Sequence, residues 1–99
     1  MFFRKSNKMC YDCQSIATVR CIGPNEYMYT AILEYVKALL ATGNYEIVAC
    51  NHPVDEVKDK DGYWVDDGIW HTIQCKQCGT RFVCSCDTYH MRGHFRREN

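Results

Sequence analysis

The stretch Ile69-Trp70-His71-Thr72-Ile73-Gln74-Cys75-Lys76-Gln77-Cys78-Gly79-Thr80-Arg81-Phe82-Val83 places a short turn between two segments rich in aromatic and β-branched residues. Such segments are typical of β-strands. The turn from Cys75 to Gly79 directs both thiols toward one point, and its last residue, a glycine, readily adopts the positive φ that ends it. The stretch therefore predicts two strands joined by a metal-binding knuckle.

Length and composition predict one small domain over residues 1–99. Twelve basic and twelve acidic residues give a formal net charge of zero, so no global field draws the chain onto nucleic acid. No apolar run approaches the roughly 20 residues that span a bilayer. The first residues lack the hydrophobic stretch of a signal peptide. We therefore expect a soluble, cytoplasmic protein without a membrane segment, whose eight cysteines are reduced and bind metal.

Residues 25–42 are predicted to form the main helix. Two apolar stripes run along this segment at helical spacing, and they consist of Tyr29, Leu33, Val36 and Leu40 and of Met28, Ile32, Tyr35 and Leu39. The helix begins after a cap at Gly23 or at Asn25, and Gly43 ends it. A core helix across a sheet accounts for this wide apolar arc, and a homodimer through the helix is the alternative.

The rest of the chain predicts a small antiparallel sheet. Residues 1–9 read as an arm or a short edge strand, residues 15–22 and 45–50 as strands, and residues 45–86 as the sheet that carries the knuckle. Residues 54–67 form an acidic excursion with a local charge of −4 and a short strand after Asp61-Gly62. For the basic tail, 87–99, an extended end and a short helix both remain open. The fold class is α+β.

Four ligands from cysteine and histidine are needed to close a tetrahedral metal site. Cys75 and Cys78 supply two of them. Cys50 and His52 are the preferred second pair, because residues two apart in a strand face the same side and a hairpin can return from Cys50 to Cys75. The predicted ligand set is therefore Cys50, His52, Cys75 and Cys78.

The order Cys50-x-His52, acidic excursion, Cys75-x-x-Cys78-Gly79 resembles zinc-ribbon-like small proteins that are often encoded by phages and mobile elements. The resemblance covers residues 47–83 and implies Zn²⁺ as the bound metal. This chain departs from the usual ribbon, because Cys-x-His stands where a second Cys-x-x-Cys is expected.

A second ligand set remains open, in which Cys10 and Cys13 join Cys75 and Cys78. If the first set is correct, the surplus cysteines are enough for a second metal ion, held by Cys10, Cys13, Cys84 and Cys86. Simple burial of these thiols is the alternative, since free cysteine packs as a small hydrophobe.

The predicted function is non-enzymatic, because a site closed by sulfur leaves no open metal position for a substrate. The first hypothesis is a zinc-stabilised protein-interaction module, in which the acidic excursion with Tyr63 and Trp64 meets a basic protein, such as a host factor if the gene is phage-borne. The second is a nucleic-acid-binding regulator that uses Arg92, Arg96 and Arg97. This second function requires that folding bring the two basic ends of the chain, residues 1–24 and 76–99, together and turn the acidic excursion away. A redox role for the surplus cysteines is a third, weaker hypothesis.

Overall fold

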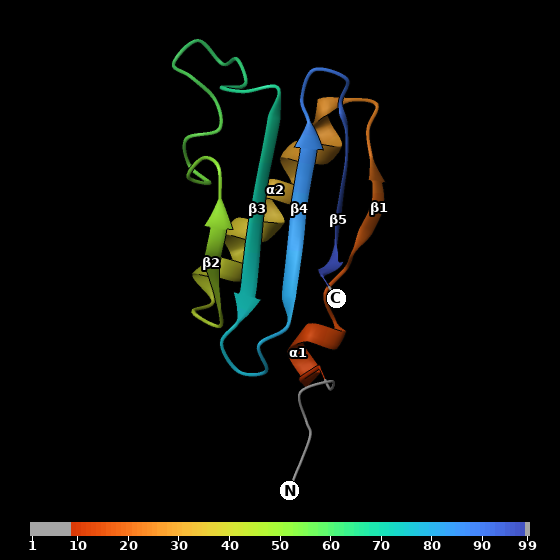
Figure 1. Cartoon of the computed structure of the whole chain (residues 1–99), viewed down its shortest axis with the longest axis vertical. Coiled ribbons are helices and arrows are strands. Elements are labelled where there is room, and N and C mark those ends of the chain that lie inside the picture. Colours follow the sequence, from red (N-terminus) through yellow and green to blue (C-terminus); the bar gives the residue numbers. More distant parts are fainter. Residues whose placement is uncertain (1–8, 99) are drawn as a thin grey trace, which may run out of the picture.

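The computed structural model describes residues 9–98. The expected arm at residues 1–9 lies almost entirely outside this range. The elements, in chain order, are α1 (Tyr11–Gln14), β1 (Val19–Ile22), α2 (Glu26–Ala41), β2 (Tyr45–Cys50), β3 (Gly68–Cys75), β4 (Arg81–Asp87) and β5 (Arg92–Glu98). The main helix is α2, and the five strands form one antiparallel sheet, which confirms the α+β prediction (Figure 1).

The sheet has the strand order β1-β5-β4-β3-β2, so the last strand of the chain lies between the first strand and β4. The strand-forming signal in the tail is weak, because charged residues alternate there with Gly93 and Phe95. Pairing on both sides decides its conformation: Phe95 stands opposite Cys84 on β4 and opposite Val19 on β1. Arg20 on β1 and the arginines of β5 therefore lie on neighbouring strands.

Helix α2 lies across one face of the sheet, behind the strands in the view of Figure 1. The side chain of Asn25 caps it by accepting a hydrogen bond from the N–H of Tyr27 at 3.0 Å, and Gly43 follows it with φ 84°. Of the two predicted starts, the cap at Asn25 is the observed one. No described helix has the length and apolar character needed to cross a membrane.

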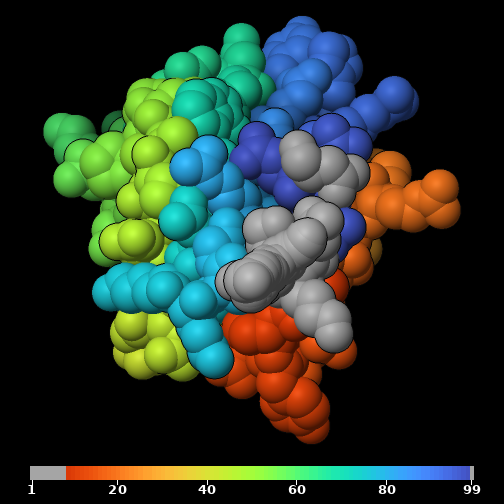
Figure 2. All heavy atoms as spheres, turned by 60° about the horizontal axis from the view of Figure 1, so that its bottom comes forward, coloured from red at the N-terminus to blue at the C-terminus, as the bar shows by residue number. Residues whose placement is uncertain are grey.

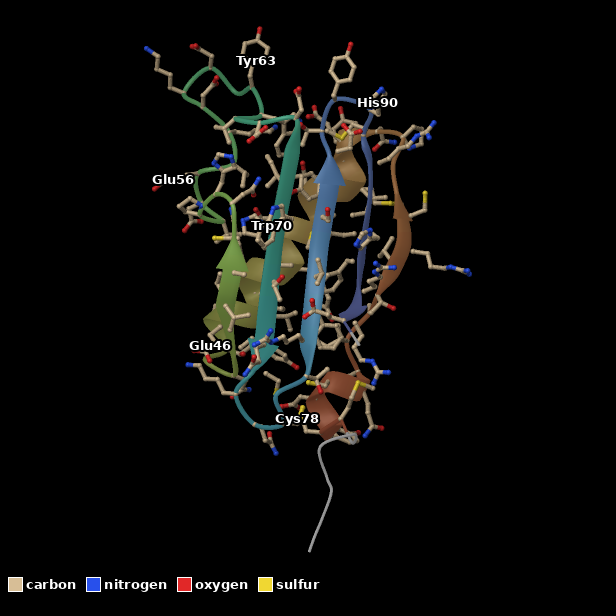
Figure 3. The ribbon with its side chains drawn as sticks, in the orientation of Figure 1. Glu46, Glu56, Tyr63, Trp70, Cys78 and His90 are labelled. Carbon is tan, nitrogen blue, oxygen red and sulfur yellow. The ribbon has the colours of Figure 1, made fainter. Side chains whose placement is uncertain are left out.

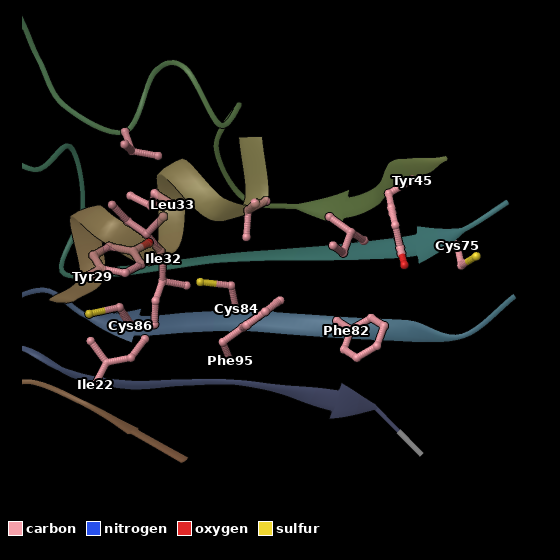
Figure 4. Close-up of a cluster of buried hydrophobic side chains, with 14 of the residues drawn as sticks. Ile22, Tyr29, Ile32, Leu33, Tyr45, Cys75, Phe82, Cys84, Cys86 and Phe95 are labelled. Atoms are coloured by element: carbon pink, nitrogen blue, oxygen red, sulfur yellow. The ribbon is translucent and has the colours of Figure 1, made fainter. Parts of the chain in front are cut away.

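The hydrophobic core fills the space between α2 and the sheet (Figure 4). Alternation on the strands supplies one half of it, because every second residue of β3, β4 and β5 faces the helix. The largest fully buried side chains include Tyr29 from the helix and Phe82 and Phe95 from the sheet. Phe82 and Phe95 pack with ring centroids 6.0 Å apart.

The acidic excursion packs beside α2. Its only described ladder contact is an isolated bridge between Lys58 and Trp64, so the predicted short strand after Gly62 is not a strand of the sheet. Trp64 stacks on Tyr29 with centroids 5.2 Å apart, and Lys58 lies over its ring. Lys58 also pairs with Glu26 of the helix at 3.7 Å. This packing covers part of the wide apolar arc of α2 from within the chain.

Candidate metal centre

Four cysteine sulfurs meet at one end of the sheet. Cys10 and Cys13 come from α1 and the residue before it, and Cys75 and Cys78 come from the turn between β3 and β4. All four Sγ atoms lie within 4.8 Å of one another. Figure 2 shows α1 (red) beside this turn (cyan), and Cys78 is labelled at the same end in Figure 3. The tetrad is a potential metal site made of soft sulfur donors.

The turn at Cys75 has the backbone geometry that the sequence predicts. Gly79 has φ 81°, and its N–H donates to the carbonyl of Cys75 at 3.0 Å. The N–H of Gln77 points at the sulfur of Cys75 at 3.4 Å. A backbone N–H aimed at sulfur stabilises the thiolate, which is the form that binds metal.

The other half of the tetrad has no glycine and uses a helical turn instead. Cys10 occupies the N-cap of α1, and its carbonyl accepts a hydrogen bond from the N–H of Gln14 at 3.1 Å. Residues three apart lie on the same side of a helix, so this turn brings Cys10 and Cys13 together. The N-terminal segment and the knuckle therefore meet as two preformed pairs.

Two hydroxyl groups contact the tetrad from outside. The hydroxyl of Tyr45 lies 3.3 Å from the sulfur of Cys13, and Oγ1 of Thr80 lies 3.0 Å from the sulfur of Cys78. Both can donate to a thiolate. Outer partners of this kind orient metal ligands and tune the metal.

The thiols of the tetrad have unequal acidity. Burial raises the pKa of Cys13. Burial opposes ionisation of Cys78 as well, but hydrogen bonds from Thr80 and backbone N–H groups outweigh it and lower the pKa of Cys78 to about 6. Cys78 is thus the readiest thiolate, and a bound cation would favour the thiolate form of the others.

The preferred sequence prediction, Cys50 and His52 with Cys75 and Cys78, is not what the structure brings together. In the antiparallel pairing of β2 with β3, Tyr45 stands opposite Cys75, whereas Cys50 stands opposite His71 at the far end of the ladder. His52 instead contacts Asp66, with 3.1 Å between Nε2 and Oδ2. The alternative set with Cys10 and Cys13 is the one that clusters.

The separation of Cys50 from Cys75 could have been predicted from the sequence. When a chain leaves one strand and returns in the antiparallel neighbour, the end of the first strand meets the start of the second. Cys50 ends β2 and Cys75 ends β3, so the two residues belong at opposite ends of the ladder. The number of residues between Cys50 and Cys75 allows the chain to return, but the antiparallel direction of the two strands keeps these residues apart.

The predicted second metal site is also separated by the fold. Cys84 and Cys86 face α2 from the middle and the C-terminal part of β4 and are buried in the core (Figure 4). Cys10 and Cys13 lie beyond the other end of this strand, with Cys75 and Cys78. Burial raises the pKa of Cys84 to about 12 and that of Cys86 to about 11. Within residues 9–98, no other group of three or more potential ligands clusters.

The residues predicted to contact partners have different surroundings. Tyr63 is 72% exposed at the tip of the excursion (Figure 3), whereas Trp64 is partly buried against the core. The three tail arginines do not share one face. Arg92 and Arg96 stand opposite Asp87 and Val83 on the face away from α2, and Arg97 stands opposite Phe82 on the helix side.

Comparison with known protein families, with curated proteins and with solved structures found no match.

Proposed function

We propose that the protein is a non-enzymatic binding module whose fold is closed by one zinc ion, held by Cys10, Cys13, Cys75 and Cys78. The spacing of the sulfurs carries this proposal. With Zn–S bonds of about 2.3 Å, the sulfurs of a tetrahedral site lie about 3.8 Å apart. The distances from Cys10 to Cys75 and from Cys13 to Cys78 are 3.7 Å and 3.5 Å, close to that value and far longer than a disulfide bond.

A site with four sulfur ligands supports a structural role for the metal. Catalytic zinc keeps one position for water or substrate, and four thiolates fill every position of a tetrahedron. The metal would join a segment before β1 to the turn after β3, two parts that are 65 residues apart in sequence. Reduced thiols also accord with the cytoplasmic location that we propose.

A basic protein partner at the acidic excursion remains our proposal for one binding surface. Support for it comes from the exposure of Tyr63 and from the excursion's carboxylates, four of which are Asp55, Glu56, Asp59 and Asp61. Trp64 contributes to the core, so this surface has a single projecting aromatic ring. Phage origin stays a prediction from the resemblance alone.

Metal analysis of the purified full-length chain tests the proposal. We expect one zinc ion per chain, lost in Cys10→Ser and retained in His52→Ala, the matched control from the ligand set that the sequence favoured. Mass spectrometry under native conditions gives the stoichiometry directly. Retention in Cys10→Ser together with loss in His52→Ala would reject the tetrad as the site.

A further inference from the structure

The sheet face opposite α2 carries no helix within the described part of the chain, and its side chains form ordered rows. Trp70, Ser85 and His94 stand directly opposite one another on β3, β4 and β5. Adjacent strands lie about 4.8 Å apart, so the two ring-bearing residues are about 10 Å apart at the backbone with a small serine between them. Trp70 is 38% exposed on this face (Figure 3).

Arginines surround this row. Arg96 lies in the next row, opposite Val83, and Arg92 lies toward the other end of β5. Arg81 is held on the same face by a 2.7 Å hydrogen bond from its Nε to Oε1 of Gln74. Exposed Arg20 lies on the adjoining strand β1. The face thus combines two flat rings with three arginines, of which Arg81 is held in place by a hydrogen bond.

The three acidic residues on this side, Asp87, Glu46 and Glu98, equal the arginines Arg81, Arg92 and Arg96 in number but lie at the two ends of the face. Asp87 accepts hydrogen bonds from the N–H groups of Tyr89 and His90 and contacts Nδ1 of His90 at 2.8 Å, so its charge is turned to the β4–β5 turn. Glu46 and Glu98 lie at the end of the sheet near the cysteines. The acidic excursion leaves the sheet from β2, the opposite edge from β1 (Figure 1).

Pairing of β1 with β5 places Arg20 on the strand next to the one that carries Arg92 and Arg96, and the excursion with its charge of −4 lies along the other edge. This placement of the excursion is one of the conditions that the sequence set for nucleic-acid binding. Burial, and secondarily the charge of Arg96, lower the pKa of His94, so its ring is neutral at neutral pH. A neutral imidazole can stack on a base as an indole does.

We propose that this open face binds single-stranded nucleic acid, with bases stacking on Trp70 and His94 and with Arg81, Arg92 and Arg96 contacting phosphates. Splayed bases can lie flat on a sheet, whereas a duplex keeps its bases stacked on each other and offers mainly its backbone. The inference rests on the proposed function, in which the metal holds the fold and the surfaces of the module bind.

Fluorescence anisotropy with the zinc-loaded full-length chain tests this inference. The probes are labelled oligonucleotides of about 12 nucleotides, as single-stranded DNA, as single-stranded RNA and as the matching DNA duplex. We expect both single strands to bind more tightly than the duplex, and affinity to fall steeply between about 50 and 200 mM salt. A difference between the DNA and RNA probes would show whether the 2′-hydroxyl is read.

Three variants locate the site. Trp70→Ala should weaken binding about tenfold or more, whereas Trp70→Tyr, which keeps a ring, should retain most of the affinity. Arg96→Gln should lower the salt dependence by about 0.7 in slope, the value for one lost phosphate contact on a single strand. Tyr27→Ala removes an exposed ring from α2, on the other side of the sheet, and is the matched control, for which no change is expected.

A fluorescence readout keeps the test valid if Trp70→Ala does not fold. In Trp64→Phe the only tryptophan is Trp70, and base stacking should quench its emission when the single strand binds. Absence of binding by the wild-type chain at about 50 mM salt would overturn the inference. Equal losses in Trp70→Ala and Tyr27→Ala, or duplex binding that is independent of Trp70, would also overturn it. The zinc content of the same samples reports separately on the metal site.

Discussion

The cysteine tetrad and the pair Cys84 and Cys86 use the same residue type in opposite ways. Sulfurs of the tetrad face one another at the end of the sheet, where N–H and hydroxyl groups point at them. Cys84 and Cys86 alternate along β4 among aromatic and aliphatic side chains, and burial keeps them protonated. Surroundings, and not the number of thiols, decide which cysteines can hold a metal.

The largest difference should appear in stability. Cys78→Ser should remove the zinc and lower the free energy of unfolding by at least about 3 kcal/mol, because structural zinc binding contributes directly to folding. Cys84→Ala, the matched core variant, should keep the zinc and cost about 1 kcal/mol through a small cavity. Denaturant unfolding with parallel zinc analysis measures both.

Loss of zinc should not affect all parts of the molecule equally. Residues 9–18 meet the rest of the chain through the tetrad and through contacts such as the 3.1 Å bond from the N–H of Ala17 to the hydroxyl of Tyr35. The core under α2 lies elsewhere and buries Tyr29, Phe82 and Phe95. In hydrogen exchange, the N-terminal segment should lose protection first. Simultaneous loss of protection in α2 would show that the metal supports the whole fold.

Alkylation should separate the cysteines into three classes. In the zinc-bound protein we expect two thiols, exposed Cys21 and Cys50, to react rapidly. A strong chelator should then make the four thiols of the tetrad reactive, and Cys84 and Cys86 should react only in denaturant. Mass spectrometry counts the added groups at each step. Reaction of Cys84 together with the tetrad after chelation would contradict the separation of the two regions.

Local sequence patterns predicted much of this fold. The period of the apolar residues gave α2 nearly to the residue, and β-branched content gave β2 and β3. The knuckle at Cys75 was predictable because its geometry depends on five consecutive residues. Each of these features follows from neighbours in the chain, which is why composition and spacing sufficed.

The second pair of ligands, Cys10 and Cys13, could not be predicted in the same way. Which cysteines meet the knuckle depends on strand pairing between distant parts of the chain, and the spacing of cysteines along the sequence carries no information on that pairing. Cys10 and Cys13 reach Cys75 only because β1 pairs with β5 and β5 lies beside β4. The tail that forms β5 looked ambiguous because its outward residues are charged. Trp64 looked exposed because its neighbours in sequence are acidic, yet Tyr29 offers its ring a stacking surface.

The smallest expected effect is on the pH dependence of stability and concerns His71, which stands opposite Cys84 in the core. Unlike the sulfurs of the tetrad, this side chain has a polar atom without a hydrogen-bond partner among residues 9–98. Its Nε2–H donates to the carbonyl of His52 at 2.7 Å, while Nδ1 has no hydrogen-bond partner in the described part of the chain. Burial lowers the pKa of His71 below its usual 6.5. Below pH 6.5 the unfolded chain takes up a proton that the folded protein resists, so stability should be full above pH 6.5 and fall as the pH drops toward the lowered pKa.

His71→Leu should remove this part of the pH dependence. We expect the stability of the wild type to fall more than that of the variant between about pH 7.5 and 5.5, whatever constant offset the lost hydrogen bond adds. The pairs of His52 with Asp66 and of His90 with Asp87 occur in both proteins, so they do not contribute to the difference between the two curves. Urea unfolding in excess zinc at each pH gives the two curves. Parallel curves would show that His71 gains a proton in the folded state as readily as in the unfolded chain. The core around His71 would then tolerate a charged side chain, as the tetrad tolerates thiolates.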